Sequence, residues 1–450
     1  MGFSFCTRHL KYVGNTASAR LSGYFHNRSR IFRACYSTPQ GSSSSITHQR
    51  VEDYTSADIF DDEDESLYPL TTEDLNYHNI RSSSFNHINS VLSQKKEHYT
   101  EDGDDLEALT KPKFTINDLT AKNECIKNYL EPYLRERVND RCSVAVFGSA
   151  ITGLWTHGSD LDLCVQIPNV NSRSAKIRNL RCIVKVLSPL APTRKFEQIF
   201  NAKIPIVHWK HTGGKSLDLP HNYSEFALDA YDGASIDIAI NNNLAVVNSS
   251  LIGVYVSIDI RVRSLIIFLK MWARNKNLND RSKGTMGSFA ISLMVIHFLQ
   301  NCSPPILPSL QDLAFSTNEI PNFVSGFDCR FTTDTKKIEA ELRYLRNNGP
   351  ENTLSSRELL MQFFKYFGWF HLHSSKKPIC IRSVDFSVFD DLFNDFKKNP
   401  SNEPFLHVDN PFEVGIDVAN IAVHERSRII SEFRKAYKLL KGGNSASSLL

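Results

Sequence analysis

Apolar residues are spaced along the chain in two patterns, one typical of helices and the other typical of strands. Helical periodicity, or an apolar run of helical length, predicts helices over Ile116–Arg137, Arg173–Leu187, Ile258–Asn275, Phe289–Gln300, Leu354–Phe367 and Ser427–Leu440. Short runs predict strands at Cys142–Phe147, Asp160–Val165 and Ser235–Ile240. This mixture of elements predicts an α+β fold.

The strand that begins at Asp160 carries two carboxylates on one face and follows a Gly-Ser turn. Side chains alternate between the faces of a strand, so Asp160 and Asp162 point the same way, while the leucines between them point into a core. Adjacent carboxylates repel each other unless a cation lies between them, and oxygen ligands suit magnesium. The turn at Gly148 and Ser149 offers backbone N–H groups and a hydroxyl that suit a phosphate. These features indicate phosphoryl-group chemistry on a nucleotide.

A third carboxylate lies in the alternating run around Asp237, between two isoleucines. If this strand lies beside the first, three carboxylates converge and can hold two metal ions, one activating an attacking hydroxyl and one clamping a triphosphate. Each fragment alone also fits a surface strand, and Asp237 alone fits a solvated or N-cap acid. The ordered combination of turn, paired acids and distant acid is far more specific.

Further segments follow the carboxylates in a fixed order. They are Asn241–Ser249, Leu269–Arg274, Gly284–Phe289 and Asn410–Glu413. With the Asp-x-Asp motif they resemble the polymerase-β-type nucleotidyltransferases, and within them the noncanonical poly(A) polymerases and terminal uridylyltransferases. The resemblance runs from about Phe114 to about Leu440.

The resemblance implies a two-lobed molecule, with the nucleotide between a small mixed-sheet catalytic domain and a mostly helical PAP-associated domain. The catalytic domain is expected at residues 141–254, and the helical domain at 113–140 together with 255–442. Residues 52–112 are polar and partly acidic, which is typical of a disordered linker. Residues 443–450 are expected to be a tail, and residues 211–232 a loop insertion.

The resemblance also assigns roles to individual residues. Asp160 and Asp162 are expected to bridge two Mg²⁺ or Mn²⁺ ions, and Asp237 to hold the ion that activates the RNA hydroxyl. Nucleotide contacts are expected from Gly148, Ser149, Asn242, Ser249, Lys270, Arg274, Ser288, Phe289, Asn410 and Glu413. Without the resemblance, six of these contact residues have a plainer interpretation: a solvated helix face for Lys270 and Arg274, an N-cap for Ser288, a core position for Phe289 and turn positions for Asn242 and Ser249.

The segment after Glu413 departs from the uridylyltransferase pattern. In uridylyltransferases the Asp-Pro-Phe-Glu motif is typically followed, three residues after the Glu, by a His that favours uracil. Here that position is Ile416, and the leading Asp is Asn410. A branched apolar residue leaves room and no competing donor, which is compatible with adenine. Glu413 is retained and an Asn can donate or accept, so the sequence favours ATP and leaves UTP open.

The N-terminal residues 1–51 differ from the rest in charge. They hold seven Lys or Arg and no acid, mixed with Ser, Thr and aromatic residues. This composition is typical of an organellar transit peptide, and Arg33–Ser37 resembles a mitochondrial processing site with cleavage before Ser37. A mitochondrial location is therefore expected. Another organelle, a cytoplasmic location and a basic arm that touches RNA remain alternatives.

The remaining chain has a net charge of −4, against +3 for the whole. Affinity for RNA is therefore expected from local patches, for which Lys336-Lys337, Arg343 with Arg346, and Lys376-Lys377 are candidates, or from a protein partner. The nine cysteines are scattered without a CxxC pair, which argues against structural zinc and a disulfide framework. No apolar run is long enough to span a bilayer, so no membrane partner is expected.

The resemblance implies a template-independent enzyme that transfers nucleoside monophosphates from ATP or UTP to an RNA 3′ end and releases pyrophosphate. Two other interpretations remain. One is a related enzyme that makes a small nucleotide messenger or CCA ends, against which the segments around Lys270 and Asn410 argue. The other is a noncatalytic RNA-processing scaffold on the same fold, against which the complete set of three carboxylates argues.

Overall fold

The computed structural model describes residues 105–112, 116–156, 158–190, 195–210, 234–373, 377–383, 404 and 406–450. All of them belong to one compact unit, residues 62–450. The expected transit peptide at 1–51, most of the expected linker and the insertion at 211–232 lie outside the described residues, as does Lys376.

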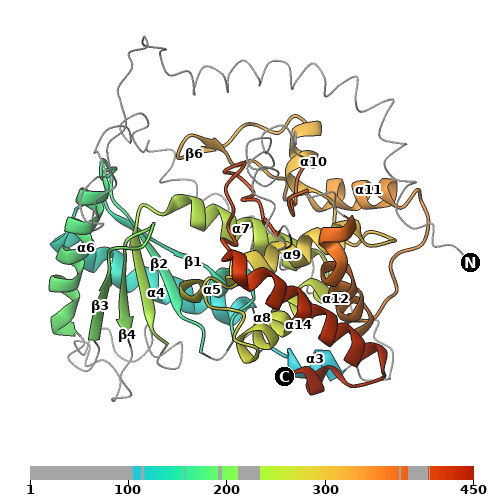
Figure 1. Ribbon diagram of the computed structural model, residues 1–450. Coiled ribbons are helices and arrows are strands. Elements are labelled where there is room, and N and C mark those ends of the chain that lie inside the picture. Colours follow the sequence, from blue (N-terminus) through green and yellow to red (C-terminus); the bar gives the residue numbers. More distant parts are fainter. Residues whose placement is uncertain are drawn as a thin grey trace, which may run out of the picture. The chain divides into compact units, whose positions relative to one another are not determined.

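A five-stranded mixed sheet forms the first domain (Figure 1). Its strand order is β1 (Ser143–Phe147), β2 (Leu161–Gln166), β5 (Ile236–Ile240), β4 (Ile206–Lys210) and β3 (Lys195–Ile199). β2 and β5 are parallel, and the other neighbours are antiparallel. The predicted α+β fold with a mixed sheet is confirmed. The sequence prediction contained β1, β2 and β5 but neither β3 nor β4.

The two faces of the sheet pack against different helices. α4 (Ile116–Arg137) and α6 (Arg173–Leu187) share one apolar cluster with alternate residues of the strands, among them Leu163. The opposite face, with Ala145 and Cys164, packs against Val246 of α7 (Asn243–Ile258). The short helix α5 (Ser149–Thr152) contacts α7 and β1. Since Asp162 lies between two residues that point toward α6, it projects from the face that α7 covers.

The placement of α4 corrects the expected domain division. The family resemblance predicts that residues 113–140 belong to the helical domain, together with the helices after residue 254. In the structure the apolar stripe of α4, with Ile126, Leu130 and Leu134 at intervals of four, is buried against the sheet. The helix therefore belongs to the core of the sheet domain.

The second domain is helical and holds the larger core. Its helices are α8 (Ile260–Asn275), α9 (Ser288–Asn301), α10 (Leu310–Ser316), α11 (Thr335–Leu345), α12 (Ser356–His373) and α14 (Val423–Lys441). The same domain contains the small strands β6 (Phe323–Val324) and β7 (Phe327–Asp328) and 3₁₀ turns at Arg281–Lys283 and Ala446–Leu449. A further 3₁₀ turn, Ser188–Leu190, follows α6 in the sheet domain. α12 and α14 lie side by side (Figure 1). Trp272 of α8 stacks on Phe433 of α14, with ring centroids 5.5 Å apart.

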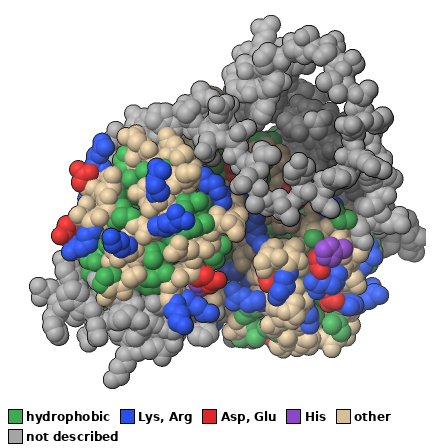
Figure 2. Space-filling view, turned by 60° about the vertical axis from the view of Figure 1, so that its left-hand side comes forward, with side chains coloured by type: hydrophobic (Ala, Val, Ile, Leu, Met, Phe, Trp, Pro, Cys, Tyr) green, Lys and Arg blue, Asp and Glu red, His purple; other side chains and the backbone are tan. Residues whose placement is uncertain are grey.

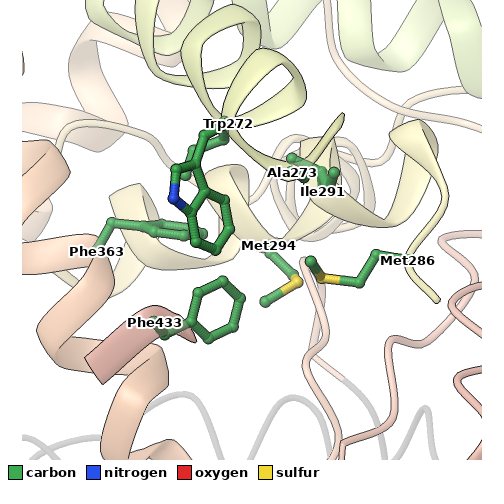
Figure 3. A pocket seen from close by; sticks show the side chains of 8 residues that line it. Trp272, Ala273, Met286, Ile291, Met294, Phe363 and Phe433 are labelled. Atoms are coloured by element: carbon green, nitrogen blue, oxygen red, sulfur yellow. The ribbon is translucent and has the colours of Figure 1, made fainter. Parts of the chain in front are cut away.

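A small pocket between these helices is lined only by apolar side chains (Figure 3). The lining includes Trp272, Met286, Met294, Phe363 and Phe433. No polar group there could orient a nucleotide, so the pocket is part of the packed core rather than a ligand site.

Three further boundaries differ from the sequence prediction. The expected tail at 443–450 contains the 3₁₀ turn Ala446–Leu449, because Ala446 and Leu449 are buried in the helical core. α12 continues through Gly368 because this glycine lies inside the contact with α14: a Cβ atom there would come within 3.2 Å of Arg434 Cγ, and Arg434 Nε donates to the Gly368 carbonyl at 2.7 Å. The stretch expected as linker contains helix α3 (Asp105–Leu109), because Leu106 is fully buried in the helical core.

Buried Arg263 connects the two domains. From α8 its Nε donates to the Gly153 carbonyl after α5 at 2.9 Å, and its Nη1 donates to the Thr110 carbonyl at 2.7 Å. Burial lowers the pKa of this guanidinium to about 10, so it remains protonated at neutral pH.

Within the described residues, no helix is long and apolar enough to cross a membrane.

His297 is expected to make folding stability depend on pH. Burial lowers its pKa from 6.5 to about 4, since the ring lies among Tyr366, Phe367 and Phe370. Its Nδ1–H donates to the Cys380 carbonyl at 2.6 Å. The unfolded state therefore binds the proton first, and stability present above pH 6.5 is lost as the pH falls toward 4, by on the order of 3 kcal/mol in full.

The measurement compares the unfolding free energy of the wild type and His297→Asn at several pH values between 5 and 7. Asparagine keeps a donor for the Cys380 carbonyl but does not titrate. We expect the wild type to lose more stability than the variant as the pH falls. Parallel curves would show that His297 does not contribute.

Candidate active site

The strand register brings two of the predicted carboxylates together. Asp162 of β2 and Asp237 of β5 are Cα partners on adjacent parallel strands, so their side chains project side by side from the same face. Asp160 lies directly before β2. Burial, and after it the negative charge of Asp237, raises the pKa of Asp160. The same causes, with the charge of Asp160 added, raise the pKa of Asp162 to about 8.

This arrangement fits divalent cations. Three converging oxygen donors that repel one another are stabilised by a positive ion, and Mg²⁺ is usually bound by one or two carboxylates together with substrate phosphates. Within the described residues, no group of three His, Cys, Asp or Glu side chains is arranged to hold a metal ion by itself. Paired carboxylates of this kind can bind such an ion together with the oxygens of a bound triphosphate.

The Gly-Ser turn lies directly against Asp162. Gly148 has φ +71°, and a Cβ atom at this position would overlap Asp162 Oδ2 and lie 2.9 Å from Asp162 Cγ. Its N–H donates to Ser249 Oγ at 2.9 Å, and Ser249 Oγ in turn donates to the Ala245 carbonyl at 2.8 Å. Ser249, expected to touch the nucleotide, thus holds the turn in place. Because the Gly148 N–H is already bonded to Ser249, the phosphate contact expected from this turn remains a prediction for Ser149.

His208 is a site residue that the sequence prediction missed. It lies on β4 opposite Asp237 in the antiparallel register, and the distance between His208 Nδ1 and Asp237 Oδ1 is 2.5 Å. The hydrogen bond fixes one oxygen of the carboxylate. A signal was present in the sequence, because the apolar residues Val207 and Trp209 flank His208 as they would on a half-buried strand.

α8 brings the two predicted cations to the carboxylates. Lys270 is 8% exposed, and burial, with the charge of Arg274, lowers its pKa to about 8, while Asp162 opposes this shift. Arg274, one helical turn later, is exposed. Its positive charge lowers the pKa of Asp160, which burial raises. Their spacing of four places both residues on one face of α8, as the sequence predicts, and their contact with the triphosphate remains a prediction.

Ser288 and Phe289 begin α9. The Ser288 hydroxyl accepts a hydrogen bond from Asn279 Nδ2 at 3.2 Å, and Phe289 packs against the helical core while remaining partly exposed. Across the described part of the chain, no hydrogen bond or ion pair links either side chain to the carboxylates. Their expected nucleotide contacts therefore remain predictions.

The three consecutive asparagines after β5 have different surroundings. Asn241, at φ +49°, accepts from the Ile167 N–H at 2.7 Å, and Asn243 accepts from Gln166 Nε2 at 2.8 Å, so both fix the end of β2. Asn242 precedes α7, and its side chain does not cap that helix. Within the part of the chain that the structure describes, the side chain assigned to the nucleotide is thus the one of the three without a structural bond to β2.

The loop that carries Asn410 and Glu413 is tightly bonded. Asn410 Oδ1 accepts from the N–H groups of Phe412 and Glu413 at 3.0 and 3.2 Å, and its Nδ2 donates to Glu413 Oε2 at 2.6 Å. The Ile416 carbonyl accepts from the Asn410 N–H at 2.9 Å. The Ile416 side chain is 42% exposed, so it is available to contact a base.

The comparisons with known proteins support the same interpretation. Residues 104–257 match the family model described as the central palm domain of mitochondrial-like poly(A) RNA polymerase. The mitochondrial poly(A) RNA polymerase of Mus musculus is 28% identical over 327 residues, 67% of this chain and 49% of that protein. Terminal uridylyltransferase 4 of Mus musculus is 29% identical over 244 residues, 53% of this chain and 13% of that protein.

The fold agrees as well. A crystal structure of mtPAP in complex with ATPγS matches with a TM-score of 0.58 and 22% identity, covering 81% of this chain and 72% of that chain. The chain spans about half the length of the mitochondrial polymerase that it matches. The family resemblance predicted from the sequence is confirmed: poly(A) RNA polymerases and terminal uridylyltransferases are homologues of this chain, and its residues 104–257 match the model of the central palm domain of mitochondrial-like poly(A) RNA polymerase.

Proposed function

We propose that the protein transfers nucleoside monophosphates from a nucleoside triphosphate to the 3′-hydroxyl of RNA, without a template. The observation that carries this proposal is the register of Asp162 and Asp237 on adjacent strands, with Asp160 before the first and Lys270 buried close by. The homology to poly(A) RNA polymerases and terminal uridylyltransferases supports the choice of RNA as the acceptor.

Each residue has a distinct task in this reaction. Asp160, Asp162 and Asp237 would hold divalent cations, Mg²⁺ or Mn²⁺, which polarise the attacking hydroxyl and neutralise charge on the triphosphate. His208 keeps the Asp237 carboxylate in one orientation. Lys270 and Arg274 offer positive charge where negative charge develops on the leaving pyrophosphate. Ser149 would contact a phosphate, and Asn242, Ser288 and Phe289 the remaining parts of the nucleotide.

ATP is the proposed nucleotide, and UTP is the alternative. Ile416 presents an exposed apolar side chain where the uridylyltransferase motif has a histidine, so a donor to the uracil edge is missing. Asn410 and Glu413 form a hydrogen bond with each other, so the polar side chains proposed to face the base have a fixed orientation before the nucleotide binds. A site without a dedicated uracil partner has no means to reject adenine.

The test is incorporation of each of the four labelled nucleoside triphosphates into a short single-stranded RNA, in the presence of Mg²⁺ or Mn²⁺. We expect ATP to be used with the highest kcat/KM. Ile416→His is expected to move the preference toward UTP by roughly tenfold, since one hydrogen bond is worth about 1.4 kcal/mol. A wild type that prefers UTP would contradict the proposed role of Ile416.

A mitochondrial location is part of the proposal. It is supported by the basic, acid-free composition of residues 1–51 and by the similarity to mitochondrial poly(A) RNA polymerase. The proposed substrates are an RNA 3′ end and ATP or UTP, and a protein partner could add affinity for particular RNAs. Fluorescence microscopy of the chain fused to a fluorescent protein, with and without residues 1–36, tests the location.

A further inference from the structure

One segment of the sheet domain concentrates positive charge. Residues 167–210 contain nine Lys or Arg and one acid, Glu197, although the chain after residue 51 has a net charge of −4. α6 alone carries Arg173, Lys176, Arg178, Arg181 and Lys185 with no acid. Figure 2 shows the sheet domain at its left, where Lys and Arg side chains outnumber Asp and Glu. Such a concentration is the electrostatic signature of a polyanion partner.

The outer face of α6 is exposed and basic. Its inner face, with Leu180, Ile183 and Leu187, is buried against the sheet, while Arg178, Arg181 and Lys185 are exposed at helical spacing on the other side. Among the described residues, none of these three cations forms an ion pair with an acid. The helix therefore presents a row of positive charge that the folded domain itself does not neutralise.

α6 and the hairpin of β3 and β4 form one fixed unit. Arg173 donates to the carbonyls of Phe200, Ala202 and Lys203 in the hairpin loop, at 2.5, 2.8 and 3.0 Å. The Arg181 guanidinium lies over the Phe200 ring, 5.4 Å from its centroid. The charges of helix and hairpin are thus held in a constant relation to each other.

The hairpin continues the positive charge onto the face that carries the active site. Lys195 and Lys210 are direct cross-strand partners at the edge of the sheet, and both are exposed. Lys210 lies two residues from His208 on β4, so its side chain projects from the same face as that of His208, the face on which His208 meets Asp237. The side chain of Lys195, the cross-strand partner of Lys210, projects from this face as well. Like charges directly opposite each other destabilise a strand pair, and an anion between the two ammonium groups would remove this repulsion.

We propose that the Lys195–Lys210 pair and the exposed face of α6 bind the phosphate backbone of the RNA whose 3′ end lies at Asp237. This inference rests on the proposed function for the identity of the polyanion. Charge complementarity favours a phosphate backbone, because the segment 167–210 offers nine ammonium or guanidinium groups against a single carboxylate. Recognition would be independent of sequence, since the cations contact phosphates rather than base edges.

The experiment measures binding of a fluorescein-labelled single-stranded oligoadenylate by anisotropy, without nucleotide or divalent metal, at several KCl concentrations. Two variants carry the test: Lys195→Gln with Lys210→Gln in the hairpin, and Arg178→Gln, Arg181→Gln and Lys185→Gln in the helix. A matched control replaces Lys365, Lys438 and Lys441, three exposed cations of the helical domain that lie outside the candidate RNA patches, with Gln. The control removes the same charge as the helix variant.

We expect both variants to bind RNA about tenfold or more weakly at low salt. The slope of log K against log[salt] should become shallower by about 0.7 for each phosphate that is no longer neutralised. The control should match the wild type. In the extension assay, the variants should raise the KM for RNA and leave the KM for ATP unchanged. A hairpin or helix variant that binds as the wild type does, or a control that weakens equally, would overturn the assignment.

Binding and chemistry are separated in this design. If the variants lose RNA binding but the wild type adds no nucleotide, the surface stands and the proposed reaction fails. If the wild type extends RNA while the hairpin and helix variants bind and extend it equally well, the surface is wrong and the reaction stands. A wild type that does not bind the oligonucleotide at any salt concentration would overturn the surface.

Discussion

Replacing Asp237 with asparagine is expected to lower kcat for nucleotide addition by at least about a thousandfold. The substitution removes one anionic ligand from a site whose cations stabilise the charge of the transition state, and a loss of about 4 kcal/mol there corresponds to this factor. Asparagine keeps an oxygen that can accept the hydrogen bond of His208. The measurement is single-turnover extension of RNA at saturating Mg²⁺, with the folded state followed by thermal unfolding.

The variant should be at least as stable as the wild type. Asp237 contributes to the raised pKa of both Asp160 and Asp162 through like-charge repulsion, and its neutralisation relieves this repulsion. Glu197→Gln is the matched control, since Glu197 is an exposed acid on β3, directly opposite His208. The control should retain activity. An Asp237→Asn enzyme that extends RNA at the wild-type rate would remove this carboxylate from the mechanism.

Replacing Gly148 with alanine is expected to lower kcat strongly by moving Asp162. The added Cβ would overlap Asp162 Oδ2, so either the turn or the carboxylate must shift. The positive φ of 71° adds about 1 kcal/mol or more of backbone strain. We expect a loss of at least about a hundredfold in kcat, because displacement of a catalytic group by about 1 Å has that effect.

Gly443→Ala separates displacement from strain. Gly443 also has a positive φ, +88°, but a Cβ atom there meets nothing within 4 Å. Both variants should lose stability through strain, and only Gly148→Ala should lose activity. Thermal unfolding and single-turnover kinetics of both proteins provide the comparison. An active Gly148→Ala enzyme would show that the turn and Asp162 are not in the arrangement described.

The sequence predicted the parts of the site that follow from local pattern. Alternation around Asp162 and Asp237 predicted two strands with outward acids, and the register then showed that the strands are neighbours. The spacing of four between Lys270 and Arg274 predicted a shared helix face, and both residues lie on α8. The end of α12 could not be predicted from the local sequence, which suggests that the helix stops at Gly368. The helix continues through Gly368, where Arg434 of the distant helix α14 donates to the Gly368 carbonyl.

His208 and the charged segment were missed for different reasons. β4 has the alternating pattern of a strand, but the local pattern does not show which strand it pairs with, and its pairing with β5 became visible only in the fold. The positive charge of residues 167–210 was present in the sequence, but the sum over all residues after 51, which is −4, concealed it. The patches at Lys337 and Arg346 proved less available, since these residues pair with Glu319 and Glu351.

The most direct test of the central claim is extension of a 5′-labelled RNA by the wild type with ATP and Mg²⁺, resolved on a denaturing gel. Parallel reactions contain EDTA, an RNA that ends in a 3′-deoxynucleotide, or the Asp237→Asn protein. We expect a ladder of added nucleotides in the reaction of the wild type with ATP and Mg²⁺, and no product in the parallel reactions. No extension by a folded wild type with any of the four nucleotides, or extension that persists with Asp237→Asn, would contradict it.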